Sequence, residues 1–365
     1  MADPLTAEIP NTETVPLDTP DQAGEKGPFR SDPRLLVQTC LLVLAVLTVC
    51  YFASDIILPI VLAIVLKLLF QPAMRLLEQL HVPRTLAALL LILTVFSVIV
   101  GVGAALSGPA TAWGEKLPGG VQRLEERLKF LSQPIGALQK FLHQFDGATV
   151  GGGGPTLAET LMKGTQHFAS GFFETILILF FLLVSGDTFL RRMVEIVPSF
   201  SDKRRVVDLS QQIEENVSAY LVTITLMNGA VGVATGIAMW ASGLGDPVLW
   251  GTVAFLLNYV PIMGPLVGVG LFLLAGLLTI DPLWQALLPA GLYLGIHIVE
   301  GEAITPMLLA RRFTLNPVLV IISLIFWFWM WGVPGAVLAV PMLAMAKIIC
   351  DGVRSLNAVG HFLEG

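Results

Sequence analysis

Long apolar segments, separated by short polar ones, make up most of this chain. Six of them have the length and apolar composition expected of a bilayer crossing, which needs ~20 apolar residues. They are 35–53, 56–70, 86–106, 169–190, 219–241 and 283–309. Pro72 is expected to close the second of these, because proline disrupts a helix interior. The pattern therefore predicts six membrane-spanning helices.

Two further apolar segments are too long for one crossing, and each is interrupted near its middle. Segment 249–280 is broken around Tyr259–Pro265, and segment 313–349 is broken at Gly332–Gly335. As one straight helix, the first would measure about 48 Å at ~1.5 Å per residue. The hydrocarbon core is only about 30 Å thick. Each segment is therefore predicted to form two short helices joined at the break.

The distribution of Lys and Arg predicts how these segments are oriented, because basic loops stay in the cytoplasm. Basic residues cluster at 75–84, 191–205, 311–312 and 347–354, whereas the connections 54–55, 242–247 and 280–282 contain none. This pattern puts both termini in the cytoplasm. It also puts both ends of 249–280 outside and both ends of 313–349 inside. Each broken segment is thus predicted to be a re-entrant hairpin, with fully crossing arms as the alternative.

The fold class that follows is an all-α polytopic membrane protein with eight helical membrane segments, six full spans and two hairpins. The predicted parts are a disordered tail (1–30), spans one to three (31–108), an extracytoplasmic helical insert with a Gly-rich linker (109–168), a transmembrane core with a cytoplasmic helix at 201–218 (169–352), and a C-terminal tail (353–365).

The insert contains apolar residues spaced alternately by four and three, which is typical of a helix-packing seam. They are Leu117, Val121, Leu124, Leu128, Leu131, Ile135, Leu138, Leu142 and Phe145. Either neighbouring subunits pack along this seam, or the seam lies on its own membrane domain. We favour subunit contact.

Composition agrees with a membrane protein and excludes several other classes. Hydrophobic residues make up 55% of the chain and charged residues 13%, and the mean hydropathy is +0.78. Soluble domains carry roughly 25% charged residues. The net charge of −6, with no basic stripe, argues against a nucleic-acid partner. The three cysteines lack the spacing of a metal or disulfide site. No catalytic constellation is present, so we expect no enzyme activity, no metal and no cofactor.

The two breaks are the candidate substrate site. Unwound backbone at membrane depth is tolerated only where protein or a water-filled cavity satisfies it. Paired interrupted segments also mark the substrate sites of transporters. The candidate substrate-binding residues are Asn258, Tyr259, Pro261, Gly264, Pro265, Thr305, Gly332, Pro334 and Gly335. The alternative is that glycine and proline merely bend these helices.

His297 and Glu300 are candidates for ion coupling. They lie three residues apart and therefore share one helical face. Ionisable groups within a membrane are costly and mark ion pathways, so such a pair is suited to carrying H⁺ or binding Na⁺. The alternatives are a buried pair that only pins the helix, or residues that meet water near the inner face.

Several short motifs point to a known family. They are Asn228-Gly229, Asn258-Tyr259-Val260-Pro261, Gly264-Pro265, Glu300-Gly301, Ile304-Thr305-Pro306, Asn316-Pro317 and Gly332-Val333-Pro334-Gly335-Ala336. Through them the chain resembles the autoinducer-2 exporter family of bacterial inner-membrane transporters, the PerM-like permeases, over residues 35–350. The resemblance implies a homo-oligomeric secondary transporter, with a pentamer as one option. Some members export a small polar signalling molecule, and others resemble cation/proton antiporters.

These observations lead to one expected function and two alternatives. We expect a secondary active transporter of the bacterial inner membrane that exports a small polar organic molecule by alternating access. Its partners would be that solute, H⁺ or Na⁺, the lipid bilayer and further copies of the chain. The first alternative is a Na⁺(Li⁺)/H⁺ antiporter. The second is a channel or membrane scaffold without coupled transport.

Overall fold

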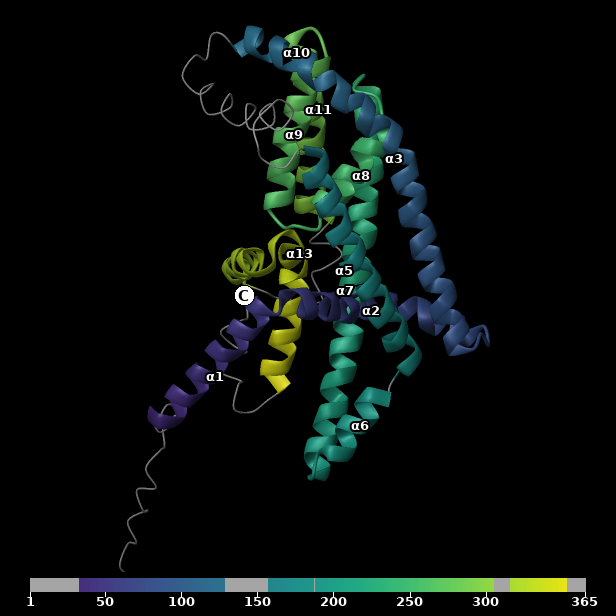
Figure 1. Cartoon of the computed structure of the whole chain (residues 1–365), viewed down its shortest axis with the longest axis vertical. Coiled ribbons are helices and arrows are strands. Elements are labelled where there is room, and N and C mark those ends of the chain that lie inside the picture. The colour runs from purple at the N-terminus through teal and green to yellow at the C-terminus, as the bar shows by residue number, and fades with distance from the viewer. Residues whose placement is uncertain (1–32, 129–156, 187, 305–315, 353–365) are drawn as a thin grey trace, which may run out of the picture. The chain divides into compact units, whose positions relative to one another are not determined.

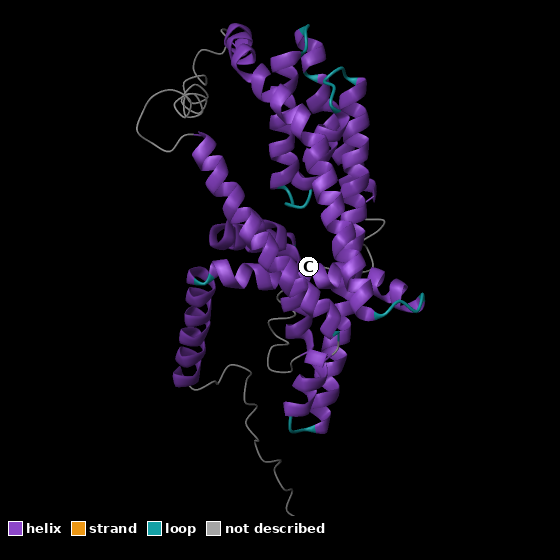
Figure 2. Ribbon diagram, turned by 45° about the vertical axis from the view of Figure 1, so that its right-hand side comes forward, coloured by secondary structure: helices purple, strands orange, loops and turns teal. Residues whose placement is uncertain are grey.

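A computed structural model describes residues 33–128, 157–186, 188–304 and 316–352 (Figures 1 and 2). These residues form helices joined by turns, with no strand among them. The chain divides into two units after Phe52. The described part of the first unit is helix α1, Pro33–Phe52. All other helices belong to the second unit.

The helices confirm a multi-pass membrane protein but not the count of eight membrane segments. Within the described ranges, five helices are long and apolar enough to cross a membrane: Ser54–Gln79, Arg84–Glu115, Asp202–Ala241, Leu283–Ile304 and Pro317–Gly352. The pair Ser170–Ser185 and Leu190–Ile196, bent by 65°, makes a sixth if it forms one span. The apolar helices Val37–Phe52, Pro247–Leu257 and Met263–Thr279 are shorter.

Helices α2 (Ser54–Gln79), α3 (Arg84–Leu128) and α5 (Leu157–Ser185) pack together. Their shared core contains Ala63 and Met74 of α2, Ala87 and Ala88 of α3, and Leu179 and Leu183 of α5. The prediction that Pro72 closes the second span is wrong, since α2 continues through it. Proline removes one backbone hydrogen bond, but the last turns of α2 bury Met74 and place Gln71 and Arg75 against a later helix. That packing outweighs the lost bond.

Helix α3 passes residue 108 without interruption and extends to Leu128. The side chains of the seam predicted at 117–145 lie outside the described residues. The two tails predicted at 1–30 and 353–365 also lie outside them. After α5, the short helix α6 (Thr188–Ile196) precedes the long helix α7.

Helix α7 (Phe200–Ala241) is the central element of the second unit and contacts α2, α6, α8, α11 and α13. It includes both the segment 201–218 and the span that follows. Helix α8 (Pro247–Leu257) runs antiparallel beside it (Figure 1). A Cβ added to Gly251 would lie 2.7 Å from the carbonyl oxygen of Gly232. Only glycine permits this approach, which is how membrane helices come into backbone contact.

The segment 249–280 is divided, as its glycines and prolines predict. Helix α8 ends at Leu257, a turn occupies 258–262, and helix α9 (Met263–Thr279) follows. The short helix α10 (Leu283–Ala286) then leads into α11 (Leu288–Val299), which packs on α9. Trp250, Phe272 and Tyr293, from α8, α9 and α11, are buried in one core cluster.

The span expected at 283–309 is not an ordinary α-helix. Helix α11 passes directly into a π-helical turn, η2, at Glu300–Ile304. Such turns are rare and are frequently found at functional sites.

Helix α13 (Pro317–Gly352) is interrupted at Gly332, whose φ of 64° and ψ of −144° are not helical. The hydroxyl of Ser323 donates to the carbonyl of Ala339 at 3.0 Å, so the two arms fold back against each other.

Candidate functional site

The first break is tied to α7 by side-chain hydrogen bonds. The side-chain Nδ2 of Asn258 donates to the side-chain Oδ1 of Asn228 at 2.9 Å. The Tyr259 hydroxyl donates to the Thr225 hydroxyl at 3.0 Å. Asn228 is 1% exposed. These hydrogen bonds pair polar side chains inside the protein, where an unpaired polar group would be costly. The break therefore has a defined position on α7.

The glycine and proline residues of the first break fit the backbone conformation that this turn requires. A Cβ on Gly264 would collide with the carbonyl oxygen of Leu257, so the chain can reverse here only with glycine. Pro261 lies in the turn, and Pro265 lies in the first turn of α9. The missing N–H of Pro265 costs nothing there, because the first N–H groups of a helix have no intrahelical partner.

The second break follows the same logic. Pro334 lies two residues after Gly332, in the first turn of the second arm of α13. A Cβ on Gly335 would collide with the carbonyl oxygen of Trp327 in the first arm. The arms therefore approach at backbone distance, and Ala336 and Ala339 continue this small-residue contact against Leu324.

The structure brings the two breaks together. Val260, in the turn of the first break, packs on the cluster formed by Leu324, Ala336 and Ala339 of α13, beside Trp327. Of the candidate substrate-binding residues, Thr305 lies outside the described residues. The others occupy the two breaks that meet at Val260.

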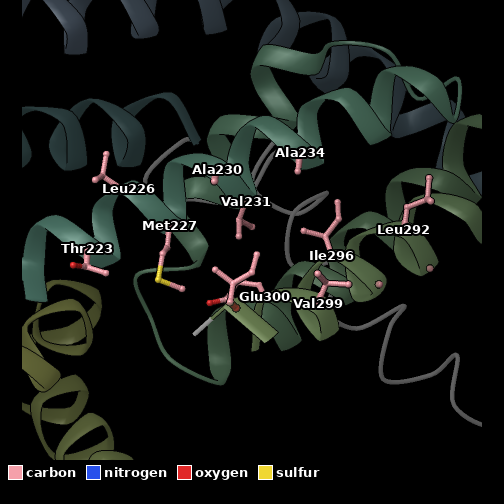
Figure 3. Close-up of a pocket in the computed structure, with 13 residues that line it drawn as sticks. Thr223, Leu226, Met227, Ala230, Val231, Ala234, Leu292, Ile296, Val299 and Glu300 are labelled. Carbon is pink, nitrogen blue, oxygen red and sulfur yellow. The ribbon is translucent and has the colours of Figure 1, made fainter. Parts of the chain in front are cut away.

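The ion-coupling candidates form a buried pair at the junction of α11 and η2. His297 Nδ1 lies 3.8 Å from Glu300 Oε2, and their side chains are 8% and 16% exposed. Glu300 also lines a cavity of about 880 Å³ between α7 and α11. Figure 3 shows the Glu300 carboxylate near Met227, with Val231, Ile296 and Val299 around it. Among the described residues that line this cavity, Glu300 is the only ionisable one and Thr223 the only other polar one.

A column of aromatic rings leads from the α7–α8 loop to this pair. Successive ring centroids in the series Trp113, Trp250, Phe272, Tyr293 and His297 lie 4.9, 5.4, 4.5 and 4.4 Å apart. At one end, Trp113 Nε1 donates to Asp246 Oδ2 at 3.0 Å. At the other end, the Tyr293 hydroxyl and His297 Nε2 are buried without a hydrogen-bond partner. Two such atoms in neighbouring side chains provide capacity to hydrogen-bond a water molecule.

The two candidate sites use different faces of α7. The cavity at Glu300 is lined by Thr223, Met227 and Ala230, whereas the first break bonds to Thr225 and Asn228. At 3.6 residues per turn these two sets point to opposite sides of the helix. Sequence reasoning placed no importance on Thr225, and it noted Asn228 only as part of a family motif.

Sequence reasoning also missed a polar cluster between α2 and α7. Glu214 Oε1 accepts from Gln71 Nε2 at 2.7 Å and pairs with Arg75. The spacing of polar residues along 214–235 was the available signal. No group of three His, Cys, Asp or Glu side chains able to hold a metal occurs among the described residues.

Comparison with known proteins now identifies the family. Residues 40–355 match the family model described as AI-2E family transporter. The chain belongs to the AI-2E transporter family. It is therefore a multi-pass membrane transporter, which agrees with the long apolar helices.

Three similar transport proteins each match more than four fifths of the chain. The AI-2 transport protein TqsA of Escherichia coli (strain K12) is 28% identical over 327 residues, covering 86% of this chain and 90% of TqsA. YhhT of the same strain is 26% identical, covering 88% of this chain and 91% of YhhT. YueF of Bacillus subtilis (strain 168) is 24% identical, with coverages of 81% and 84%. The last two have only provisional names as transport proteins.

Proposed function

We propose that this AI-2E transporter exports a small polar organic solute of the autoinducer-2 type across the bacterial inner membrane by alternating access. The observation that carries the proposal is the contact of Val260 with the arms of α13, which joins the two backbone breaks. The name of the relative TqsA supports the solute class. Nothing in the comparisons favours the Na⁺(Li⁺)/H⁺ antiporter.

The substrate would bind where the breaks meet. Helix ends at a break leave N–H and C=O groups without intrahelical partners, and these groups cannot face lipid without a cost of several kcal/mol each. A polar solute can satisfy them. Asn258 and Tyr259, with the backbone around Pro261, Gly264, Pro265, Gly332, Pro334 and Gly335, would provide its contacts, together with Thr305. Movement of the two broken segments against α2, α3 and α5 would expose the site to each side in turn.

His297 and Glu300 would couple this movement to protons. The two side chains lie 3.8 Å apart and are largely buried, and ionisable groups within a membrane mark ion pathways. The π-helical turn at Glu300 gives the pair a segment whose hydrogen bonding can rearrange. The transporter would work as a homo-oligomer, assembled along the apolar seam of the insert.

Flux into inside-out vesicles, measured with autoinducer-2 with and without a pH gradient, tests the proposal. The variants Pro261→Ala and Pro334→Ala should reduce flux about tenfold or more, since misplacement of binding groups is costly. Glu300→Gln should transport without pH dependence. Gly270→Ala, at an exposed position of α9 with open space around it, is the matched control and should retain wild-type flux. Wild-type vesicles without autoinducer-2 flux would overturn the proposed solute.

A further inference from the structure

Polar side chains recur on one face of α7 along most of its length, with Leu221 and Gly232 between them. Glu214, Ser218, Thr225, Asn228 and Thr235 are separated by four, seven, three and seven residues. Combinations of three and four keep residues on the same side of a helix. We call this set the α7 polar face. It extends from the basic end of the helix to within two turns of Ala241.

The α7 polar face points into the protein, and the apolar side of the helix points away from it. Ser218, Asn228 and Thr235 are 6%, 1% and 0% exposed. On the other side, Leu226, Val233 and Ile237 are exposed. A membrane helix that buries its polar residues and exposes its apolar ones has the pattern expected beside a polar path.

Two cavities adjoin the α7 polar face at its basic end. The cavity nearer the start of α7, here called the outer cavity, has a volume of about 600 Å³ and is lined by Arg75, α6 and residues 207–215 of α7. The inner one, about 350 Å³, is lined by Gln71 and Gln79 of α2 and by residues 214–219 of α7. The inner cavity therefore lies further along α7 towards the middle of the span. Its wall includes Ser218, the next member of the polar face.

The Arg75–Glu214 ion pair lies at the boundary of these cavities. Both residues line both cavities, together with Glu215. Glu214 joins α7 to α2 by accepting from Arg75 and from Gln71. The arginine and glutamate side chains are 53% and 22% exposed. An ion pair that remains in contact with water contributes little stability and breaks easily, which suits a gate better than a structural bridge.

Unused hydrogen-bonding capacity continues along the α7 polar face beyond the cavities. Asn228 Nδ2 and Thr235 Oγ1 are buried without a hydrogen-bond partner. Buried groups of this kind are rare and need an explanation. Between them and Ser218, Thr225 is bonded to Tyr259 of the first break. The polar face thus includes both a wall of the inner cavity and the hydrogen-bond partners of the first break.

We propose that the α7 polar face is the solute path of this transporter, with the Arg75–Glu214 pair as its inner gate, and that the path takes neutral hydroxylated solutes. This inference rests on the proposed function. Beyond Glu214, the face offers only hydroxyl and amide groups, which can replace the hydration of a polyol. They cannot compensate the burial of a charge, which costs far more. The outer cavity also holds three carboxylates, Glu195, Glu214 and Glu215, against two guanidinium groups, which disfavours anions.

The first experiment tests the path by cysteine accessibility in reconstituted vesicles. Cys40, Cys50 and Cys350 are replaced by Ser, and single cysteines are then placed at Ser218, Thr225 or Thr235. A small, neutral, hydrophilic thiol reagent should label all three, and autoinducer-2 or the neutral polyol ribitol should slow labelling. The anion ribonate should not. Val233→Cys, on the exposed apolar side of the same helix, is the matched control and should stay unlabelled.

The second experiment tests the gate by charge reversal. Arg75→Glu and Glu214→Arg should each lower autoinducer-2 flux about tenfold, and the double variant should recover most of it, because only the coupled pair restores the contact. Arg204 and Asp208 form an exposed pair within α7, at 3.9 Å. Reversal of that pair is the matched control and should leave flux unchanged.

The outcomes separate this inference from the proposed function. Wild-type flux of autoinducer-2 with unlabelled or unprotected cysteines on the α7 polar face would overturn the path and leave the function standing. Equal protection by ribonate would overturn the neutral solute class. Flux that is insensitive to both reversals at Arg75 and Glu214 would overturn the gate. Absence of wild-type flux would overturn the function itself.

Discussion

Single residues determine where the backbone of this transporter can break, and Gly332 shows this most clearly. Its φ of 64° with ψ of −144° belongs to a region that side chains with a Cβ avoid. No atom lies within 4 Å of the position that a Cβ would occupy. The need for glycine at Gly332 is therefore purely conformational, and space plays no part in it.

Gly332→Ala should consequently lower the free energy of unfolding by ~1–3 kcal/mol, the usual cost of such strain. Gly270→Ala is the matched control, because Gly270 also has open space around it but lies inside helix α9. There alanine should stabilise the protein by up to about 1 kcal/mol. Thermal unfolding in detergent should shift in opposite directions for the two variants. A shift in the same direction would show that Gly332 does not hold this conformation.

Asp246 combines a conformational role with a hydrogen bond, and substitution can separate the two. It adopts a left-handed conformation at φ 43° and ψ 58° and accepts from Trp113. Asp246→Asn should remain close to wild type, because asparagine tolerates that conformation and keeps an acceptor. Asp246→Gly should lose ~1–3 kcal/mol with the bond, and Asp246→Ala should lose about 1–2 kcal/mol more. Equal stability of the Gly and Ala variants would contradict the conformational part.

Among the elements, α7 and α8 depend on backbone contact, and their shared glycines provide a test. A Cβ on Gly232 would lie 2.8 Å from the carbonyl oxygen of Gly251, whereas a Cβ on Gly229 would meet no atom within 4 Å. Gly232→Ala should push the helices apart and cost ~1–3 kcal/mol, as overpacking usually does. Gly229→Ala, one turn earlier in the same helix, should be neutral or slightly stabilising. Unfolding of the two variants in one detergent measures the difference directly.

The elements also show what could be predicted from the sequence. Gly264, Pro265, Gly332 and Pro334 located both breaks, because these residue types act through local backbone geometry that needs no knowledge of the fold. Pro72 was misleading because its effect on the helix depends on the rest of the fold. Its effect on α2 was outweighed by contacts with α7 that lie far away in sequence. The π-helical turn at Glu300 has no periodicity of its own, so apolar patterning could not reveal it.

The candidate site divides in the same way between predictable and unpredictable parts. Asn258, Tyr259, His297 and Glu300 stood out because polar residues are rare in apolar segments. Their partners Asn228 and Thr225 did not, since a single polar residue in a long helix gains meaning only from what packs against it. The contact between the breaks at Val260 joins residues separated by more than 60 positions, and no local pattern contains that information.

At the scale of the whole molecule, helix length constrains how the chain enters the membrane. Helix α8 has 11 residues and α9 has 17, which correspond to about 16 and 26 Å at ~1.5 Å per residue. Neither covers a hydrocarbon core of about 30 Å. The flanking connections at 242–247 and 280–282 also lack Lys and Arg. Both arguments favour a hairpin that enters and leaves at the outer face.

The topology is testable with three cysteines in a background lacking Cys40, Cys50 and Cys350. Ser242→Cys and Asp281→Cys should both react with a membrane-impermeant thiol reagent in intact cells, since the hairpin returns to the face from which it starts. Arg204→Cys, at an exposed position in the basic segment before the span of α7, should react only after the cells are opened, because basic segments stay inside. Reaction of Ser242→Cys and Asp281→Cys from opposite sides would mean that α8 and α9 together cross the membrane once. The broken segment would then be an interrupted span and not a re-entrant hairpin.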